Sequence, residues 1–77
     1  MNLSPTTTAD FVRPVFFGGP GDGREFCQIK AADIKGSMKW YKSDGDWRKP
    51  SRVVGSYELV GFRNYGAEAV YQWEPAP

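Results

Sequence analysis

The sequence contains no histidine and a single cysteine, Cys27. Without histidine, a Ser–His or Cys–His nucleophile pair cannot form, and zinc or haem sites lose their usual ligands. A lone cysteine forms no internal disulfide, whereas small secreted domains usually carry several, so we expect a reducing, cytoplasmic location. Cys27 itself is expected to be a small buried hydrophobic residue. These absences predict a protein with no cofactor, no metal site and no catalytic residues.

The sequence also lacks a long apolar run and a strong net charge. No stretch approaches the roughly 20 apolar residues that a membrane helix needs, and the first ten residues lack the basic start and apolar block of a secretory signal. With a net charge of +1, no overall field draws the protein to DNA or to a membrane surface. We therefore expect no membrane partner.

Aliphatic residues are scarce and aromatic residues are plentiful. Leu and Ile occur only twice each, which disfavours a helical bundle because a bundle needs aliphatic residues at helix spacing. Phe, Trp and Tyr make up 16% of the 77 residues. Each buried aromatic side chain removes about 150–250 Å² from water, so a few can form the core of a chain this short. We therefore expect aromatic rings to fill the core.

The most regular stretch covers residues 56–74 and predicts a hairpin at the end of the chain. Its two halves alternate with a period of two, which places successive side chains on opposite faces of a strand. Between the halves, residues 63–66 include an Asn and a Gly, which readily adopt the positive φ of a tight turn. Tyr71 and Trp73 are the largest side chains expected on the inward face.

Two stretches before this hairpin are also predicted to be strands. Residues 11–17 (FVRPVFF) are rich in β-forming residues. Because Pro14 has no N–H to donate, it confines such a strand to an edge of the sheet or ends it early. Residues 24–32 (REFCQIKAA) alternate, and the side that carries Cys27 is expected to face the core.

A second hairpin is predicted around an Asp-Gly turn at residues 43–46 (SDGD). The strand before this turn, residues 38–42 (MKWYK), places Lys39 and Tyr41 on the same face. The segment after the turn is ambiguous, because Pro50 interrupts any strand there.

Residues 18–23 (GGPGDG) contain four glycines in six positions and predict a loop. The glycine spacing is that of a phosphate-binding loop, but Arg24 and Glu25 stand where that loop needs a Lys and a Ser or Thr. Asp44 and Asp46 flank a glycine, and the twelve-residue calcium pattern is absent, so turn formation explains them better than a cation site.

Together these patterns predict a mostly β fold with little helix. We expect a small single-domain antiparallel sheet or barrel of about five strands, of the size of SH3 or OB domains. Residues 1–10, which are polar and include Pro5 and three threonines, predict a flexible N-terminal arm, and residues 11–77 a single β-rich domain. One helical turn is possible within residues 31–37, and residues 67–73 (AEAVYQW) could also form a helix.

Basic and aromatic residues are interleaved in the second half of the chain. Residues 30–63 hold eight basic and four acidic side chains, a difference of +4. Single-stranded nucleic acid binds to surfaces of this kind, because phosphates pair with Lys and Arg while bases stack on rings. The five-strand prediction is also compatible with an oligonucleotide-binding barrel. The alternative is that the charges form a solvated face and the rings belong to the core.

The same residues suit protein recognition, since interface centres are enriched in Trp, Tyr and Arg. We therefore predict a non-catalytic module that binds another protein through an aromatic and basic loop surface, as an accessory or inhibitor protein of phage type that acts on a host protein. The alternative is a single-stranded nucleic-acid-binding protein that uses residues 39–52, and a small nuclease or lyase is a third hypothesis. The edge at Phe11–Phe17 could add a strand to a partner or form a homodimer. The expected binding residues are Lys39, Tyr41, Lys42, Trp47, Arg48, Lys49, Arg52, Arg63 and Tyr65.

Overall fold

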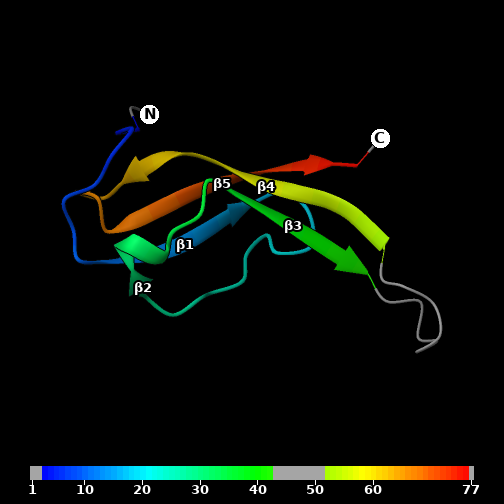
Figure 1. The fold of residues 1–77 in the computed structure, drawn as a ribbon, viewed down its shortest axis with the longest axis horizontal. Coiled ribbons are helices and arrows are strands. Elements are labelled where there is room, and N and C mark those ends of the chain that lie inside the picture. The colour runs from blue at the N-terminus through cyan, green and yellow to red at the C-terminus, as the bar shows by residue number, and fades with distance from the viewer. Residues whose placement is uncertain (1–2, 43–51, 77) are drawn as a thin grey trace.

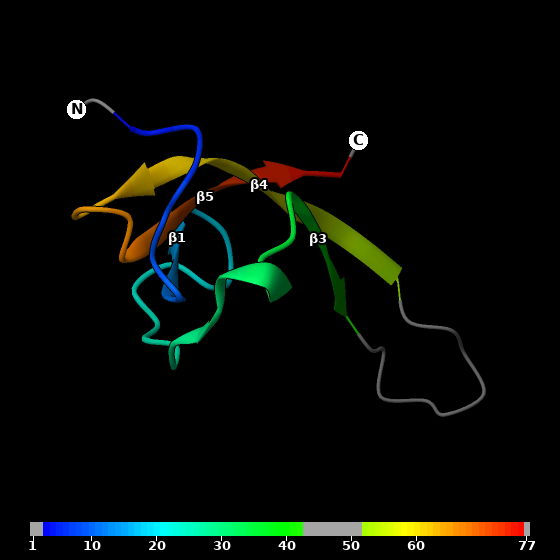
Figure 2. The same cartoon turned by 60° about the vertical axis from the view of Figure 1, so that its left-hand side comes forward.

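The computed structural model describes residues 3–42 and 52–76. In chain order the elements are strands β1 (Phe11–Phe17) and β2 (Ile29–Lys30), the short 3-10 helix η1 (Ala31–Asp33), and strands β3 (Ser37–Lys42), β4 (Arg52–Arg63) and β5 (Glu68–Pro75). The strands form one sheet in the order β2-β1-β5-β4-β3, which curls into a half-barrel (Figures 1 and 2). The predicted mostly β fold of about five strands is confirmed.

The sheet is mixed, whereas the sequence patterns led us to expect antiparallel pairing. β1 and β5 run parallel, from the pair Arg13 and Glu68 to the pair Phe17 and Gln72. The other neighbouring strands are antiparallel. A parallel pair needs a long crossover connection, and here the connection contains β2, η1, β3 and β4. Alternation along a strand does not carry information about the direction of its neighbour.

The hairpin predicted for residues 56–74 is present as β4 and β5. Its turn contains three successive residues with positive φ, namely 57° at Asn64, 59° at Tyr65 and 83° at Gly66. The N–H of Ala67 donates to the carbonyl of Asn64 at 3.1 Å, which closes the turn. Positive φ at both central residues is typical of the type I′ turns that suit hairpins.

A β-bulge in β4 allows residues of odd and even number to face the core. The register between β4 and β5 shifts between Leu59 and Gly61. Tyr57 before the bulge and Phe62 after it are both buried. Without the extra residue, Phe62 would lie on the face opposite to Tyr57, since successive side chains alternate.

Aromatic rings fill the core, as predicted. Tyr57 lies at the centre, and its ring centroid is 4.4 Å from that of Phe16 and 4.8 Å from that of Trp73. Trp40 approaches the same ring edge-on at 5.5 Å. Of the two expected inward residues of β5, Tyr71 is 1% exposed and Trp73 is half-buried against the core. The buried hydrophobic residues are Val12, Phe16, Tyr57, Phe62, Ala69, Val70 and Tyr71.

Residues 18–36, which we call the covering segment, close the open side of the half-barrel (Figure 2). Phe26, Ala31 and Ile34 of this segment pack against the core. Two core hydroxyls hold its backbone. Tyr57 donates to the carbonyl of Gly18 at 2.8 Å and accepts the N–H of Gly21 at 2.7 Å, and Tyr71 donates to the carbonyl of Lys35 at 2.5 Å. The predicted glycine loop is therefore present, and the Tyr57 hydroxyl holds it against the core.

Pro14 occupies the side of β1 that faces away from β5. The N–H of Arg13 donates to the carbonyl of Ala67 at 2.9 Å. In a parallel ladder alternate residues bond to the same neighbour, so Arg13 and Val15 bond toward β5, whereas the nitrogen of Pro14 points the other way. β1 is not the edge strand that the sequence led us to expect, because it lies between β2 and β5. Its pairing with β2 covers only Phe11 and Val12, so Pro14 lies beyond that ladder, where no N–H is needed.

The strand predicted for residues 24–32, with Cys27 facing the core, is wrong. Only Ile29 and Lys30 form a strand, and Cys27 is exposed. Val12 pairs with Ile29, and the next pair on that side of β1 would join Pro14 to Cys27. Because Pro14 has no N–H to donate, the ladder ends before Cys27.

Residues 3–7 lie along the end of β4 that β3 does not reach. Ser4 and Phe62 exchange two backbone hydrogen bonds of 2.9 and 2.8 Å. The Thr7 hydroxyl donates to the carbonyl of Gly66 at 2.8 Å. The predicted flexibility of the N-terminal arm concerns its motion and stays a prediction.

Candidate binding surface

The described residues of the predicted binding set fall into two groups at opposite ends of β4. One, which we call the β3-edge group, comprises Lys39, Tyr41, Lys42 and Arg52. The other comprises Arg63 and Tyr65 at the β4–β5 turn. The 12 residues of β4 extend over roughly 36 Å at about 3.3 Å per residue, so the two groups form separate surfaces. Trp47, Arg48 and Lys49, and the turn predicted at residues 43–46, lie outside the described residues.

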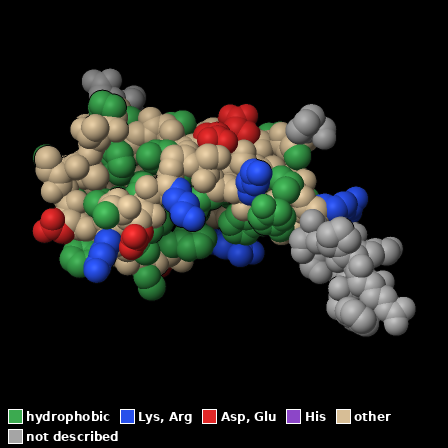
Figure 3. Space-filling view, in the orientation of Figure 1, with side chains coloured by type: hydrophobic (Ala, Val, Ile, Leu, Met, Phe, Trp, Pro, Cys, Tyr) green, Lys and Arg blue, Asp and Glu red, His purple; other side chains and the backbone are tan. Residues whose placement is uncertain are grey.

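The β3-edge group lies where β3 and β4 begin to separate from the rest of the sheet. Lys42 and Arg52 are register partners, and Tyr41 pairs with Val53. All are exposed, and Tyr41 has 56% of its surface accessible. Figure 3 shows basic side chains beside hydrophobic ones over β3, whereas the acidic side chains on this face lie at the upper edge and at the left-hand end of the molecule. The structure therefore keeps an aromatic residue and several cations together at this edge.

A groove adjoins the β3-edge group at the mouth of the half-barrel, and we call it the mouth groove. Its volume is about 680 Å³. The described residues that line it come from β1, β2, η1, β3, β5 and the link between η1 and β3, and are Pro14, Ile29, Asp33, Lys35, Ser37, Met38, Lys39, Tyr41 and Tyr71. The groove thus lies between the two outer strands of the sheet, and ligand sites often occupy the mouths of barrels.

The mouth groove lies against the edge of β3 and not only against one of its faces. Three successive residues, Ser37, Met38 and Lys39, line it, although successive side chains of a strand point to opposite faces. The N–H of Leu59 donates to the carbonyl of Gly36 at 2.8 Å. Alternate residues of an antiparallel strand bond to the same neighbour, so the backbone groups of Gly36, Met38 and Trp40 all point toward β4. The backbone groups of Ser37 and Lys39 therefore point away from β4.

The groove combines apolar and basic side chains. Pro14, Ile29, Met38 and the Tyr41 ring give it apolar walls. Lys35 and Lys39 are exposed, and Asp33 is the one carboxylate among its described lining residues. The two lysines attract anions to the groove. The attraction is weak, because exposed charges keep most of their hydration.

Tyr71 forms the base of the groove. Burial raises the pKa of its hydroxyl above the ordinary value of 10.0. The neutral hydroxyl donates to the carbonyl of Lys35, so this part of the covering segment is held only while Tyr71 keeps its proton. The residue is best understood as a support for the groove.

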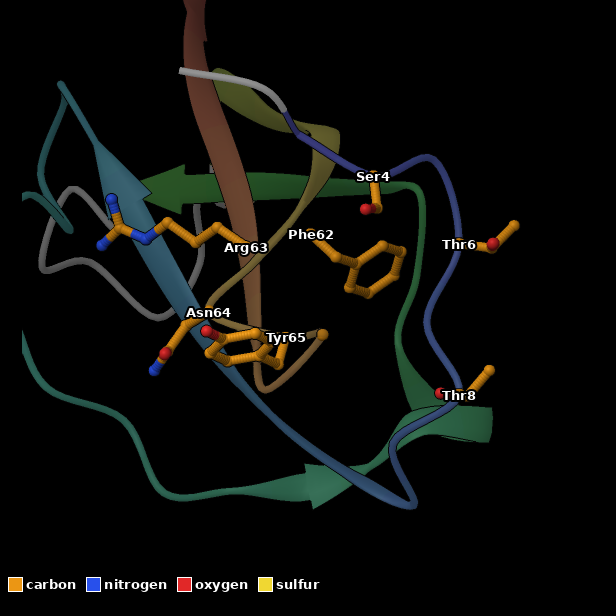
Figure 4. A pocket seen from close by; sticks show the side chains of 8 residues that line it. Ser4, Thr6, Thr8, Phe62, Arg63, Asn64 and Tyr65 are labelled. Atoms are coloured by element: carbon orange, nitrogen blue, oxygen red, sulfur yellow. The ribbon is translucent and has the colours of Figure 1, made fainter.

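The second group lies beside a different hollow, between the N-terminal arm and the β4–β5 turn (Figure 4). Its volume is about 630 Å³. Tyr65 is fully exposed there. Arg63 pairs with Glu68 at 3.2 Å, and its guanidinium lies 5.2 Å from the centroid of the Phe17 ring. Arg63 is thus engaged in contacts within the fold. The residues that line this hollow are Ser4, Thr6, Thr8, Phe62, Arg63, Asn64, Tyr65 and Gly66.

The described residues lack the features of three other kinds of site. In that part of the chain no group of three or more His, Cys, Asp and Glu is placed to hold a metal ion. No charged side chain of the described ranges is buried. In residues 3–42 and 52–76 we also find no helix whose length and apolar character would let it cross a membrane.

Sequence reasoning missed most of the mouth groove. It singled out Lys39 and Tyr41 but gave no role to Pro14, Ile29 or Lys35, which lie far apart in the chain. Only the curvature of the sheet brings them together, and no local pattern records that curvature.

Comparison of the chain with protein-family models, with curated proteins and with solved structures gave no match.

Proposed function

We propose that the protein is a non-catalytic binding module that recognises another protein through the mouth groove and the adjoining edge of β3. The observation that supports this most is the position of an apolar groove of about 680 Å³ directly against an outer strand of the sheet. Exposed sheet edges take up extended segments of partner proteins, and neighbouring pockets hold their side chains. An accessory or inhibitory role toward the partner would be one use of such a surface.

Tyr41 is the proposed anchor of this interface. It is a large side chain that is more than half exposed, and it lines the groove. Tyrosine is among the residues whose truncation most often weakens protein complexes by 2 kcal/mol or more, as a rough guide. Met38, also in the lining, adds a flexible apolar contact of the kind enriched at interfaces.

The test is affinity capture from a host-cell lysate, with three immobilised proteins. We expect a partner that is retained by the wild type, retained by Tyr65→Ser and lost by Tyr41→Ser. Tyr65→Ser is the matched control, because Tyr65 is also an exposed tyrosine but lies at the opposite end of β4. Retention of the same proteins by the Tyr41→Ser variant would remove the groove from the proposed function.

A second candidate is binding of single-stranded nucleic acid. The observation that favours it is that Lys39 and Lys42 lie on the same strand as Tyr41, and Arg52 is the register partner of Lys42 on β4. Three phosphate contacts predict that the logarithm of the affinity falls with the logarithm of the salt concentration with a slope of roughly −2. Fluorescence titration with a mixed-sequence oligonucleotide measures this slope. Protein recognition alone predicts no binding of the oligonucleotide. Unchanged fluorescence on addition of the oligonucleotide at low salt would therefore remove the second candidate.

A further inference from the structure

We propose that the mouth groove binds an extended peptide segment of alternating acidic and apolar residues, which adds to β3 as a sixth strand. This inference rests on the proposed function and names the chemistry of the partner. It depends on three properties of the β3 edge: its backbone groups, the charges beside it, and the two faces of the strand.

The backbone of β3 offers hydrogen-bonding groups toward the groove. Gly36, Met38 and Trp40 bond toward β4, so the N–H and C=O groups of Ser37 and Lys39 point to the other side. These four groups lie where three successive residues of β3 line the groove. An extended segment placed there would pair with them as a neighbouring strand does.

The outer edge of β1 is a poorer template than the edge of β3. Its ladder toward β2 ends at Val12, and the next residue on that side, Pro14, has no N–H. The edge predicted at Phe11–Phe17 for strand addition or for a homodimer therefore retains few donors. The prediction of a dimer there stays untested. The edge of β3 offers more backbone groups for hydrogen bonding than the edge of β1.

The charges beside β3 select an acidic partner. Lys35 and Lys39 line the groove and Lys42 ends the strand, whereas Asp33 is the one acidic residue among the described lining residues. A second copy of this chain paired symmetrically through β3 would bring like charges together, and edge lysines of this kind oppose self-association. An acidic segment would meet opposite charges.

The two faces of β3 set the alternation of the partner. Met38 and Trp40 face the core side, and Lys39 and Tyr41 face outward. The side chains of an added strand would follow the same alternation. Apolar side chains would enter the groove beside Met38 and Ile29, and acidic side chains would lie beside Lys39.

The test uses a labelled eight-residue peptide of alternating Glu and Val and a second peptide of alternating Lys and Val, each titrated against the wild-type protein by fluorescence anisotropy. We expect the acidic peptide to bind and the basic peptide to bind at least about tenfold more weakly. Opposite charges on neighbouring strands stabilise the pairing, whereas like charges destabilise it. Lys39→Glu is expected to weaken the binding of the acidic peptide by roughly five- to tenfold. Lys30→Glu makes the same change at an exposed position outside the groove lining, and should leave the affinity unchanged.

Amide hydrogen exchange distinguishes strand addition from any other mode of binding. The bound peptide should slow the exchange of the Ser37 and Lys39 amides. The amides of Met38 and Trp40, which already bond toward β4, should be protected with and without peptide. Binding without new protection at Ser37 and Lys39, equal affinity for both peptides, absence of binding by the acidic peptide, or a dimer with these amides protected would each overturn the proposal.

The two proposals fail in different ways. Loss of a captured partner from Tyr41→Ser, together with unchanged exchange at Ser37 and Lys39, would retain the groove and remove strand addition. Retention of every captured protein by Tyr41→Ser, together with peptide-dependent protection at Lys39, would show strand addition without the proposed anchor.

Discussion

Trp73 rests against two glycines from different parts of the chain. A Cβ atom at Gly55 on β4, or at Gly19 in the covering segment, would overlap its indole ring. At Gly55 the backbone does not require positive φ, so the close approach of the ring is the reason for glycine there. The indole is thus held between the sheet and the covering segment, where it also contacts Tyr57.

Gly55→Ala should therefore destabilise the protein by about 1–3 kcal/mol, because an added methyl group forces Trp73 out of its place. Urea unfolding followed by circular dichroism measures the change. Gly36→Ala is the matched control, because a Cβ there meets no atom within 4 Å, and it should change the free energy of unfolding by no more than about 0.5 kcal/mol. Equal effects of the two substitutions would contradict this packing.

Tyr71 couples stability to high pH. Burial raises the pKa of its hydroxyl above that of the unfolded chain, so the folded state retains this proton more strongly. The contribution is fully present below pH 10 and is lost as the pH rises through the higher folded pKa. We expect the free energy of unfolding to fall with rising pH above about 10, and Tyr71→Phe to reduce that slope. An unchanged slope in Tyr71→Phe would contradict this coupling.

At the scale of elements, the β4–β5 turn places a bulky residue in a left-handed conformation. Tyr65 has φ of 59° and is fully exposed, so no packing within the described fold offsets the cost of that conformation. Non-glycine residues tolerate it poorly, and Asn tolerates it best.

Tyr65→Asn should raise the free energy of unfolding by roughly 0.3–1 kcal/mol, because Asn adopts positive φ at lower cost. Thermal unfolding gives the comparison. Tyr65→Val places a β-branched residue at the same φ and should lower the stability instead. If Asn and Val had the same effect, the conformation of this turn would not be what limits stability there.

The elements that the sequence predicts well are those with strong local signals. β1 was predicted with its observed bounds, and the hairpin of residues 56–74 and the strand at residues 38–42 are present. The strand at residues 24–32 failed for a reason outside that stretch. Pro14 ends the ladder of its partner strand after Val12, so alternation around Cys27 had no neighbour to pair with.

The candidate site was predictable only in part. Lys39 and Tyr41 stand out because a cation and a ring lie close in sequence, and both line the groove. Arg63 and Tyr65 belong to the same composition pattern, yet the length of β4 separates them from the groove. Distance along a strand can be estimated from the sequence, whereas the curl that brings Ile29 toward Met38 follows from tertiary packing.

At the scale of the whole molecule, the half-barrel is closed without strand pairing between its two outer strands. β2 and β3 stand at opposite ends of the sheet order, and the covering segment, which contains β2, lies over the aromatic core (Figure 2). Its backbone is held by the hydroxyls of Tyr57 and Tyr71. One wall of the mouth groove, at Asp33 and Lys35, belongs to this segment, so the shape of the groove depends on these hydroxyls.

Removal of the Tyr57 hydroxyl should therefore loosen the covering segment while the sheet remains intact. Tyr57→Phe deletes two hydrogen bonds to the glycine loop, and we expect a loss of about 1–3 kcal/mol, at roughly 1 kcal/mol per bond with a further penalty for the buried Gly21 N–H. Cys27 is the one cysteine of the chain and is exposed within the segment, so a dye attached there reports its motion. The dye anisotropy should fall in Tyr57→Phe and stay unchanged in Tyr65→Phe, while the far-ultraviolet circular dichroism of both variants matches the wild type. An unchanged anisotropy in Tyr57→Phe would mean that the packing of Phe26 and Ile34, rather than the tyrosine hydroxyls, holds the segment in place.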